Sequence, residues 1–368
     1  MNAPKNYKIT LTAASPLFIG SGQSYYKNEY LYDNRTRKIS VINQEALLGW
    51  IVAKNKTQAF ESFMLSNRTD CYLSKFFDEM RIRPENIPGL ITYTVDAGVA
   101  IKKKGVLMEI KTFIKNADGR PYIPGSSFKG ALRTILLTKM LRDSAVNAPL
   151  PQIVADTKAA AKIEEKYLHT LKRTNDGANA LNSVMSAVAI SDSAPLDHTA
   201  LLLCRKVDLS TGGDEGRLNI ARESLRPGAQ AELILTLKPE AGSLNAEYIK
   251  KAIEEFGHYY RKTYVEKFKT PKEAAENDFT NCIFLGGGSG YFSKNILYPG
   301  RDFERALETT ASIMHSRYSK HKHDQDRDRG ISPHTLKYTE YQEHEGGRIV
   351  KGQMGLCRVE MTEIKERA

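Results

Sequence analysis

The sequence contains few cysteines and no long apolar run, and these two lacks exclude several classes of protein. Its four cysteines, Cys71, Cys204, Cys282 and Cys357, lie far apart and form no C-x-x-C pair. We therefore expect reduced thiols, with neither a disulfide framework nor a cysteine metal site. No apolar stretch reaches the roughly 18 residues that indicate a membrane span. The opening MNAPKNYKITLT lacks the apolar core of a secretory signal, so we expect a cytoplasmic protein without a membrane partner.

Signatures of common enzymes are missing as well. The sequence has no G-x-x-x-x-G-K-[ST] loop, no G-x-S-x-G elbow and no H-x-x-x-H pair, which argues against the chemistries that depend on them. His321 and His323 stand with Asp324, Asp326 and Asp328 in the run HKHDQDRDR, which has suitable ligand types for a metal ion. Because no fold signal flanks this run, we interpret it as a solvated loop. We expect no metal, no cofactor and no catalytic residue.

What the sequence does have is an excess of positive charge. Lysine and arginine total 54 against 43 aspartates and glutamates, a formal net charge of +11 over 368 residues. Such a surplus favours polyanionic partners, nucleic acid first. The length suggests two domains, or one domain with large insertions. We place the boundary near residue 195, which gives domains 1–195 and 196–368.

Periodicity predicts an α+β protein in which strands and helices mix along the chain. Tyr7 to Ala13 alternates as a strand should, and further short strands are predicted in both halves. The predicted helices begin after Asn43, run from about Ser126 to Arg142 and from Asn245 to Phe268, and fill an insertion over residues 143–182.

The sharpest motif is PYIPGSSFKGALRT. Gly125 gives backbone freedom to the turn that leads into the predicted helix, and Ser126 or Ser127 is a natural N-cap. The free N–H groups and the positive dipole end of the helix favour an anion. Lys129 and Arg133 lie four residues apart, on one helix face near that end. Together they predict a phosphate cradle for a polynucleotide; a capped helix with two solvated cations remains the alternative.

Two glycine-rich turns are further candidates for contact with phosphate. IGSG at residues 19–22 and GGGSGYFSKN at residues 286–295 can each form a nest of backbone N–H groups, with Lys294 beside the second. Each is also typical of a tight loop without a ligand. The lysines of GVAIKKKG, at residues 102–104, are typical of an exposed hairpin tip.

Together these motifs resemble the RAMP superfamily of CRISPR-associated proteins. IPGSSFKGALRT is similar to the superfamily signature, and the opening strand followed by SPLFIGSG is similar to its N-terminal pattern. AISDS, ESLRPG and LGGGSGYFSKN resemble its strand–turn, its E-x-L-x-P-G turn and its C-terminal glycine-rich loop. In order, spacing and length the motifs are most similar to the family of fifth subunits of the Csm complexes, the type III-A effectors.

The resemblance implies two RRM-like, ferredoxin-type modules with helical insertions, the second divergent. It implies a non-catalytic subunit that binds the 3′ region of the CRISPR RNA, caps the backbone filament and assists 3′-end maturation with nucleases encoded by other genes. Its partners would be CRISPR RNA, target RNA in the guide duplex, and other Csm subunits, above all the repeated backbone subunit. The RNA contacts that the resemblance implies are Gly20, Gly22, Gly125, Ser126, Ser127, Lys129, Arg133, Gly286, Gly287, Gly288, Gly290 and Lys294, with Lys102, Lys103 and Lys104 in a thumb-like loop.

One departure from the superfamily bears on catalysis. Backbone subunits of such complexes cut target RNA with an aspartate after their IGxG turn, whereas this loop reads SYYKNEY and has Glu29 as its one acid. This argues against cleavage. A metal-independent endoribonuclease that processes guide precursors remains the alternative, and a histidine or tyrosine near Lys129 would favour it. A third hypothesis, a subunit that contacts protein alone, is disfavoured by the cations beside the helix start.

Overall fold

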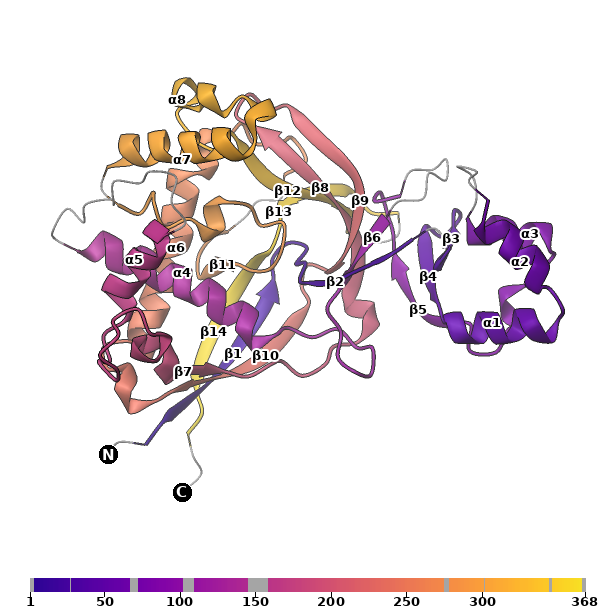
Figure 1. The fold of residues 1–368 in the computed structure, drawn as a ribbon, viewed down its shortest axis with the longest axis horizontal. Helices are drawn as coiled ribbons and strands as arrows, with labels where there is room; N and C mark the ends of the chain where they lie inside the picture. Colours follow the sequence, from indigo (N-terminus) through magenta and orange to yellow (C-terminus); the bar gives the residue numbers. More distant parts are fainter. Residues whose placement is uncertain are drawn as a thin grey trace.

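The structure of the protein is a computed structural model in which two β-sheets share the chain (Figure 1). It describes residues 3–26, 28–66, 72–101, 109–144, 158–274, 278–300, 302–343 and 346–365. The predicted lysine loop, Lys102 to Lys104, lies outside these residues. Among the described helices, none combines the length and the apolar character that a membrane span requires.

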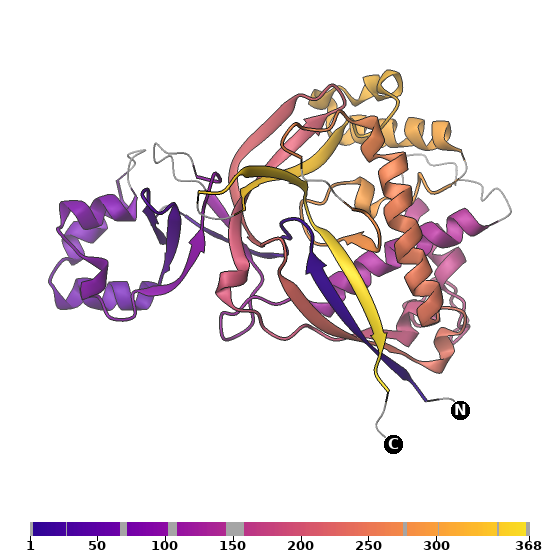
Figure 2. The same ribbon diagram turned by 180° about the vertical axis from the view of Figure 1, so that it is seen from behind.

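The first sheet, sheet A, has five strands in the order β11-β14-β1-β10-β7, and every neighbouring pair is antiparallel. Its central strand β1 alternates buried Tyr7, Ile9 and Leu11 with more exposed residues, so one face is apolar. Figures 1 and 2 show β1 beside β14, with the two chain ends close together. The bounds are β1 Lys5–Ala13, β7 Val188–Ile190, β10 Gln230–Leu237, β11 Cys282–Phe284 and β14 Leu356–Glu363.

Two long helices, α4 (Gly125–Asp143) and α6 (Ala246–Thr263), pack against each other and cover sheet A. Asn245 caps α6 by accepting the Tyr248 N–H at 2.9 Å. The buried side chains of both helices join those of β1 in one large core. Helix α5 (Lys158–Leu168) lies against α4. The helices predicted at about 126–142 and from Asn245 are confirmed.

The second sheet, sheet B, runs in the order β2-β6-β9-β8-β5-β4-β3, with β12 paired to β8 and β13 paired to β12. Most of its pairs are antiparallel, while β6–β9 and β5–β8 are parallel. Helices α7 (Phe303–Arg317) and α8 (Asp326–Arg329) precede β12. The bounds are β2 Gly20–Tyr25, β3 Tyr30–Asp33, β4 Lys38–Ile42, β5 Ile91–Asp96, β6 Glu109–Phe113, β8 Leu201–Ser210, β9 Glu215–Leu225, β12 Thr335–Gln342 and β13 Ile349–Gln353.

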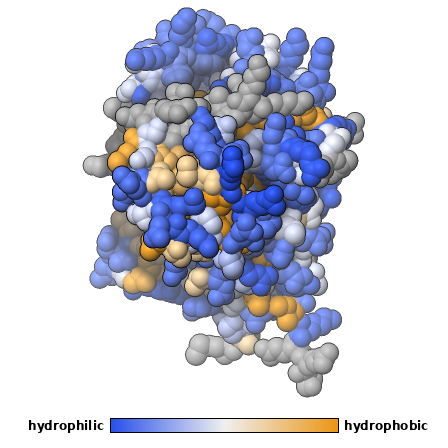
Figure 3. All heavy atoms as spheres, turned by 90° about the vertical axis from the view of Figure 1, so that its right-hand side faces the viewer, coloured by the Kyte–Doolittle hydropathy of each residue, from blue (hydrophilic) through white to orange (hydrophobic). Residues whose placement is uncertain are grey.

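The far end of sheet B carries a helical lobe, seen on the right of Figure 1. It consists of α1 (Gln44–Ala53), α2 (Thr57–Met64) and α3 (Leu73–Glu79), and has its own core around Phe60 and Phe76. Asn43 caps α1 as predicted, accepting the N–H groups of Glu45 and Ala46. Seen from this end, the surface is mostly hydrophilic with separate apolar patches (Figure 3). Leu48 and Val52 are among the exposed apolar side chains of α1.

The mixture of strands and helices confirms the predicted α+β class. Each sheet takes strands from both sides of residue 195. The division into 1–195 and 196–368 therefore does not separate the two sheets. That these two ranges fold as separate units stays a prediction. The described cysteines, Cys204, Cys282 and Cys357, are free and buried, and burial raises the pKa of the Cys282 thiol to about 11.

Candidate nucleic-acid interface

The start of α4, the predicted phosphate cradle, is held by the turn that follows β7. The Gly125 N–H donates to Asp192 Oδ1 at 2.8 Å, and the Ile123 N–H donates to Ser193 Oγ at 2.9 Å. A Cβ on Gly125 would lie 2.4 Å from the carbonyl oxygens of Ile190 and Ser191. The AISDS turn therefore positions the helix, and a carboxylate of the chain itself already accepts the first N–H of the helix.

The outer face of α4 remains open beyond this contact. Ser126 and Gly130 are exposed, Ser127 is partly buried, and a Cβ on Gly130 would meet nothing within 4 Å. Arg133 forms an ion pair with Glu164 of α5 at 3.4 Å. The side-chain contacts of this face thus leave room for a ligand between Ser126 and Arg133.

Lys129 has a different environment from Arg133. Burial lowers the pKa of Lys129, and the positive charge of Lys238 lowers it further. Among the described residues, no carboxylate forms an ion pair with Lys129, and no histidine or tyrosine hydrogen bonds to it. An added anion would relieve the repulsion between these two cations. Lys238 follows β10 and was not predicted as part of the cradle.

The two glycine-rich turns, predicted separately, lie side by side. The Gly287 N–H donates to the Phe18 carbonyl at 2.7 Å. Gly286 has φ +79°, and a Cβ there would lie 2.1 Å from the same oxygen. The short turn Phe292–Lys294 that follows the loop contacts α4. The fold therefore brings the two glycine-rich turns together, and the end of the second one contacts α4.

The remaining predicted glycines are placed as follows. A Cβ on Gly288 would meet Met354, one on Gly290 would meet Lys337, and one on Gly20 would meet the ring of Phe18. Gly22 has φ +86° and open space around it. The crowded positions have an intramolecular reason to be glycine, so their contact with RNA stays a prediction. Lys294 is exposed at the end of the same loop.

A group of cations that the sequence analysis did not predict lies beside these turns. Arg222 of β9 lies over the Phe18 ring at 5.5 Å, and its Nε is buried without a hydrogen-bond partner. Burial lowers the pKa of Arg222, and no described carboxylate forms an ion pair with it. Lys206 and Lys337 both lie 2.9 Å from Asp208.

This group, the basic cluster of Lys206, Arg222 and Lys337, has three cations around one carboxylate. Burial lowers the pKa of Lys337, and Asp208 opposes that effect. Partly desolvated cations with too few anions are the arrangement expected where a phosphate backbone binds. The cluster was missed because β9 and β12, which supply Arg222 and Lys337, were not predicted as strands.

Several groups that often appear in catalysis form a buried hub near β2. Its members are Glu223, Tyr93, Lys115 and His198. Glu223 accepts the Tyr93 hydroxyl at 2.6 Å and the Phe113 N–H at 2.9 Å, and it also pairs with Lys115. Tyr93 stacks on His198 with ring centroids 4.2 Å apart. Because Glu223 is 1% exposed and Tyr93 is 7% exposed, the hub joins strands and does not face a ligand.

Glu29, the acid of the loop after β2, has a local structural contact. Its carboxylate accepts the Tyr26 N–H at 2.8 Å. Tyr25, the last residue of β2, reaches the hub through a hydroxyl contact of 3.4 Å with Tyr93. Tyr26 remains exposed.

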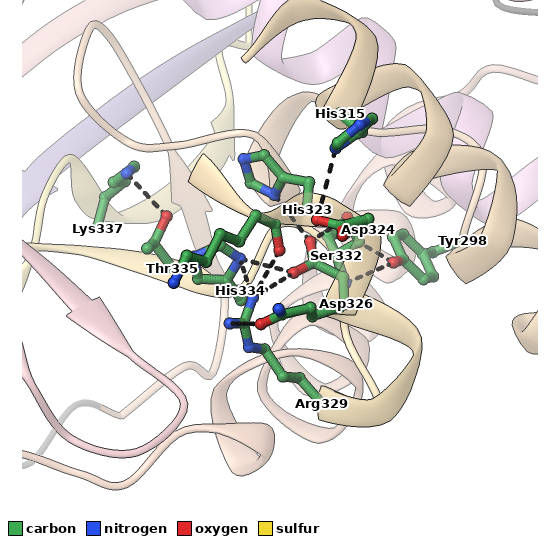
Figure 4. Close-up of polar contacts among 12 residues, drawn as sticks. Tyr298, His315, His323, Asp324, Asp326, Arg329, Ser332, His334, Thr335 and Lys337 are labelled. Carbon is green, nitrogen blue, oxygen red and sulfur yellow. Dashed lines mark hydrogen bonds and ion pairs between the residues drawn. The ribbon is translucent and has the colours of Figure 1, made fainter. Parts of the chain in front are cut away.

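The prediction of a solvated loop at HKHDQDRDR is wrong for two of its residues. His321, Asp324 and Asp328 are exposed, but His323 and Asp326 are buried. Figure 4 shows both pointing toward His334, which stands just before β12. Burial follows because this segment packs on α7 and on the start of β12, pairings that local sequence does not reveal.

Comparison with known proteins places this arrangement in a family. The model of the RAMP superfamily matches residues 10–343. The chain is 28% identical over 334 residues to "CRISPR system Cms protein Csm5" of Streptococcus thermophilus, covering 87% of this chain and 85% of that protein. It is 27% identical over 361 residues to the protein of the same name from Mycobacterium tuberculosis, covering 91% and 93%.

Solved structures show the same fold. A chain in the cryo-EM structure of a Csm-crRNA-target RNA ternary complex of a type III-A CRISPR-Cas system superposes with a TM-score of 0.65 at 20% identity, covering 96% of this chain and 100% of that one. The crystal structure of T. onnurineus Csm5 gives a TM-score of 0.61 at 18% identity, with coverage of 95% and 99%. The likeness therefore extends over nearly the whole of both chains.

Proposed function

The chain belongs to the RAMP superfamily, and from this premise we propose that it is a subunit of a type III-A CRISPR effector complex that binds guide RNA without cutting it. It binds the 3′ region of the CRISPR RNA and caps the filament of repeated backbone subunits. Target RNA reaches it through the guide duplex. Assistance in 3′-end maturation, with nucleases encoded by other genes, is included on the resemblance alone.

The observation that carries the proposal is the convergence of backbone turns and cations. The turns at residues 19–22 and 286–290 touch through Phe18, and the basic cluster lies against them. The turn that follows the second loop contacts α4, the helix on which Lys129 has no carboxylate partner among the described residues. Backbone N–H groups and unpaired cations on one surface suit a polyanion of extended shape.

The fold also supports the RRM-like part of the proposal. Along the chain, β1, α4, β7, β10, α6 and β14 follow the β-α-β-β-α-β order of a ferredoxin-like module. We assign the first module to sheet A with these two helices, and the divergent second module to sheet B.

The direct test uses a guide RNA labelled separately at each end, with and without Mg²⁺. We expect the purified chain to leave the RNA intact and to protect its 3′ portion. The side chains of α4 supply the variant: Lys129→Ala with Arg133→Ala should weaken binding. It should also lower the slope of log affinity against log salt by roughly 0.7 for each phosphate that the variant no longer neutralises.

Lys8→Ala is the matched control for this variant. Lys8 is an exposed cation on β1 that pairs with Glu232, away from α4, so its removal should leave the salt slope unchanged. If the double variant binds with the affinity and slope of the parent, the cradle assignment is wrong. Cleavage that follows the protein through purification would instead support the endoribonuclease alternative.

Arg222→Met should lower RNA affinity without lowering the stability of the protein. Methionine can fill the space between Phe18 and Met354, and it removes a guanidinium that is partly desolvated and unpaired within the described chain. We expect unfolding by urea to be unchanged or to require more urea. Removing a charge-assisted hydrogen bond of about 1.5–3 kcal/mol should lower RNA affinity roughly tenfold or more. Fluorescence anisotropy measures the affinity.

Arg217→Met, on the same strand, should give the opposite pattern. Arg217 forms ion pairs with Glu215 and Glu340, so its removal should cost about 1 kcal/mol of stability or less and leave RNA affinity intact. Equal RNA affinity for the Arg222 and Arg217 variants would count against the basic cluster as a binding site.

A further inference from the structure

We propose that His323, Asp326 and His334 form a binding site for a divalent metal ion, zinc in the first place. Their three ligand atoms lie within 4.8 Å of one another. Asp326 is fully buried and His323 is 6% exposed, and Figure 4 shows the side chains converging between α8 and the start of β12. The site is separate from the proposed RNA surface and does not depend on it.

The ligand set suits zinc. Two imidazole nitrogens and one carboxylate are a common protein donor set for zinc, which accepts a fourth ligand from solvent or from a further side chain. Both histidines turn Nδ1 toward Asp326: His323 Nδ1 lies 2.8 Å from Oδ2, and His334 Nδ1 lies 2.6 Å from Oδ1. Ser332 Oγ, 2.7 Å from Oδ2, is the nearest further oxygen donor.

Hydrogen bonds alone leave one mismatch in this cluster. Arg329 Nη1 lies 3.0 Å from three atoms: the Lys322 carbonyl oxygen, Asp326 Oδ1 and His334 Nδ1. If His334 Nδ1 carries a proton for Asp326, two donors face each other across the contact with Arg329. If it carries none, its lone pair faces a carboxylate oxygen at 2.6 Å. Either protonation state therefore contains a close, unfavourable contact.

A metal ion removes the mismatch. Nδ1 and Oδ1 would both direct lone pairs at the ion, while Arg329 keeps the Lys322 carbonyl and Gln325 Oε1 as acceptors. With zinc bonds of about 2.0–2.1 Å in tetrahedral geometry, the ligand atoms would stand roughly 3.3 Å apart. The present spacings of 2.6 and 2.8 Å must therefore open by about half an ångström. The Arg329 side chain, 28% exposed, can move outward to allow it.

The bound ion would be structural. It would join the segment after α7, which carries His323 and Asp326, to the residue that precedes β12. Tyr298 already anchors this loop, because its hydroxyl donates to the Ser332 carbonyl at 2.7 Å. Three residues beyond His334, β12 carries Lys337 of the basic cluster. A metal here would therefore fix the start of the strand that presents Lys337.

Zinc titration of the full chain tests the site. The protein is first stripped with a chelator, and Zn²⁺ is then added in competition with a chromophoric chelator. We expect one equivalent per chain in the parent and in His321→Gln, an exposed histidine two residues from His323. His323→Gln and His334→Gln should each lose it. Binding should also release imidazole protons, which calorimetry detects as a heat that depends on the buffer.

Thermal unfolding gives the second readout. Zn²⁺ should raise the melting temperature of the parent and of His321→Gln, but not that of His334→Gln. The proposal is overturned if the parent binds no stoichiometric Zn²⁺, or if the glutamine variants at 323 and 334 bind as the parent does. Should those variants fail to fold, Co²⁺ absorption of the parent decides: absence of tetrahedral d–d bands refutes the site.

Discussion

Replacing Gly125 by alanine should destabilise the protein by roughly 2–5 kcal/mol, the combined cost of overpacking and of breaking a partly buried hydrogen bond. The new Cβ would stand 2.4 Å from two carbonyl oxygens of the Ile190–Ser191 backbone. Backbone atoms cannot rotate away as a side chain can, so α4 must move off β7. The hydrogen bond from the Gly125 N–H to Asp192 would break with it. Urea unfolding followed by circular dichroism measures the change in stability.

Gly130→Ala is the matched control, the same chemical change five residues along the same helix. A Cβ at Gly130 meets nothing within 4 Å, and alanine is favoured over glycine inside a helix by about 1 kcal/mol. We expect equal or higher stability. Equal destabilisation by both substitutions would show that α4 does not pack on the β7 turn as described. A Gly130→Ala protein that is stable but binds RNA weakly would indicate close approach of RNA at this position.

The elements that the sequence predicted best are those specified by local signals. Asn43 and Asn245 each accept backbone N–H groups at a helix start. An asparagine directly before an apolar helical pattern predicts this capping role. The prediction that Ser126 or Ser127 caps α4 is wrong, because the helix begins at Gly125, directly after Pro124, and both serines lie inside it. The role of Asp192 was not found, because its partner Gly125 lies 67 residues away in the chain.

The strands that the sequence missed owe their burial to distant partners. β9, EGRLNIARESL, contains a glycine and several charges, yet it lies between β6 and β8 and buries Ala221, Glu223 and Leu225. β12, TLKYTEYQ, is half polar and is buried through β8 and β13. Cations on such strands look solvated in sequence. For this reason Arg222 and Lys337 could not be assigned to the candidate site.

The same reason explains His323 and Asp326. Their neighbours are charged, so the run was interpreted as solvated, and only the fold brings His334 against them. The glycine turns were predicted correctly as turns, but not as neighbours: contact through Phe18 depends on strands at opposite ends of the chain. Single motifs could thus be predicted from local sequence, whereas the grouping of charged residues depends on the pairing of strands that are distant in the chain.

Glu223→Gln should strongly destabilise the protein although it hardly changes the side-chain volume. The carboxylate is 1% exposed and pairs with Lys115, whose side chain is 13% exposed. Removal of one partner leaves the other charge buried without compensation, which costs about 3–5 kcal/mol. Glu109→Gln is the matched control. Glu109 pairs with Lys111 on β6, but its side chain is 29% exposed, so its replacement should cost much less stability. Urea midpoints compare the two.

The double variant Glu223→Gln with Lys115→Met identifies the cause of the stability lost in Glu223→Gln. If the penalty arises from an unpaired ammonium, removing that ammonium should restore much of the stability, and the double-mutant cycle should show strong coupling. Additive effects would instead assign the penalty to the hydrogen bonds from Tyr93 and the Phe113 N–H. Since the hub joins β5 and β6 to β9, the strand of Arg222, RNA affinity should recover in the double variant together with stability. Recovered stability without recovered binding would mean that the charges of the hub act on RNA directly, which their burial argues against.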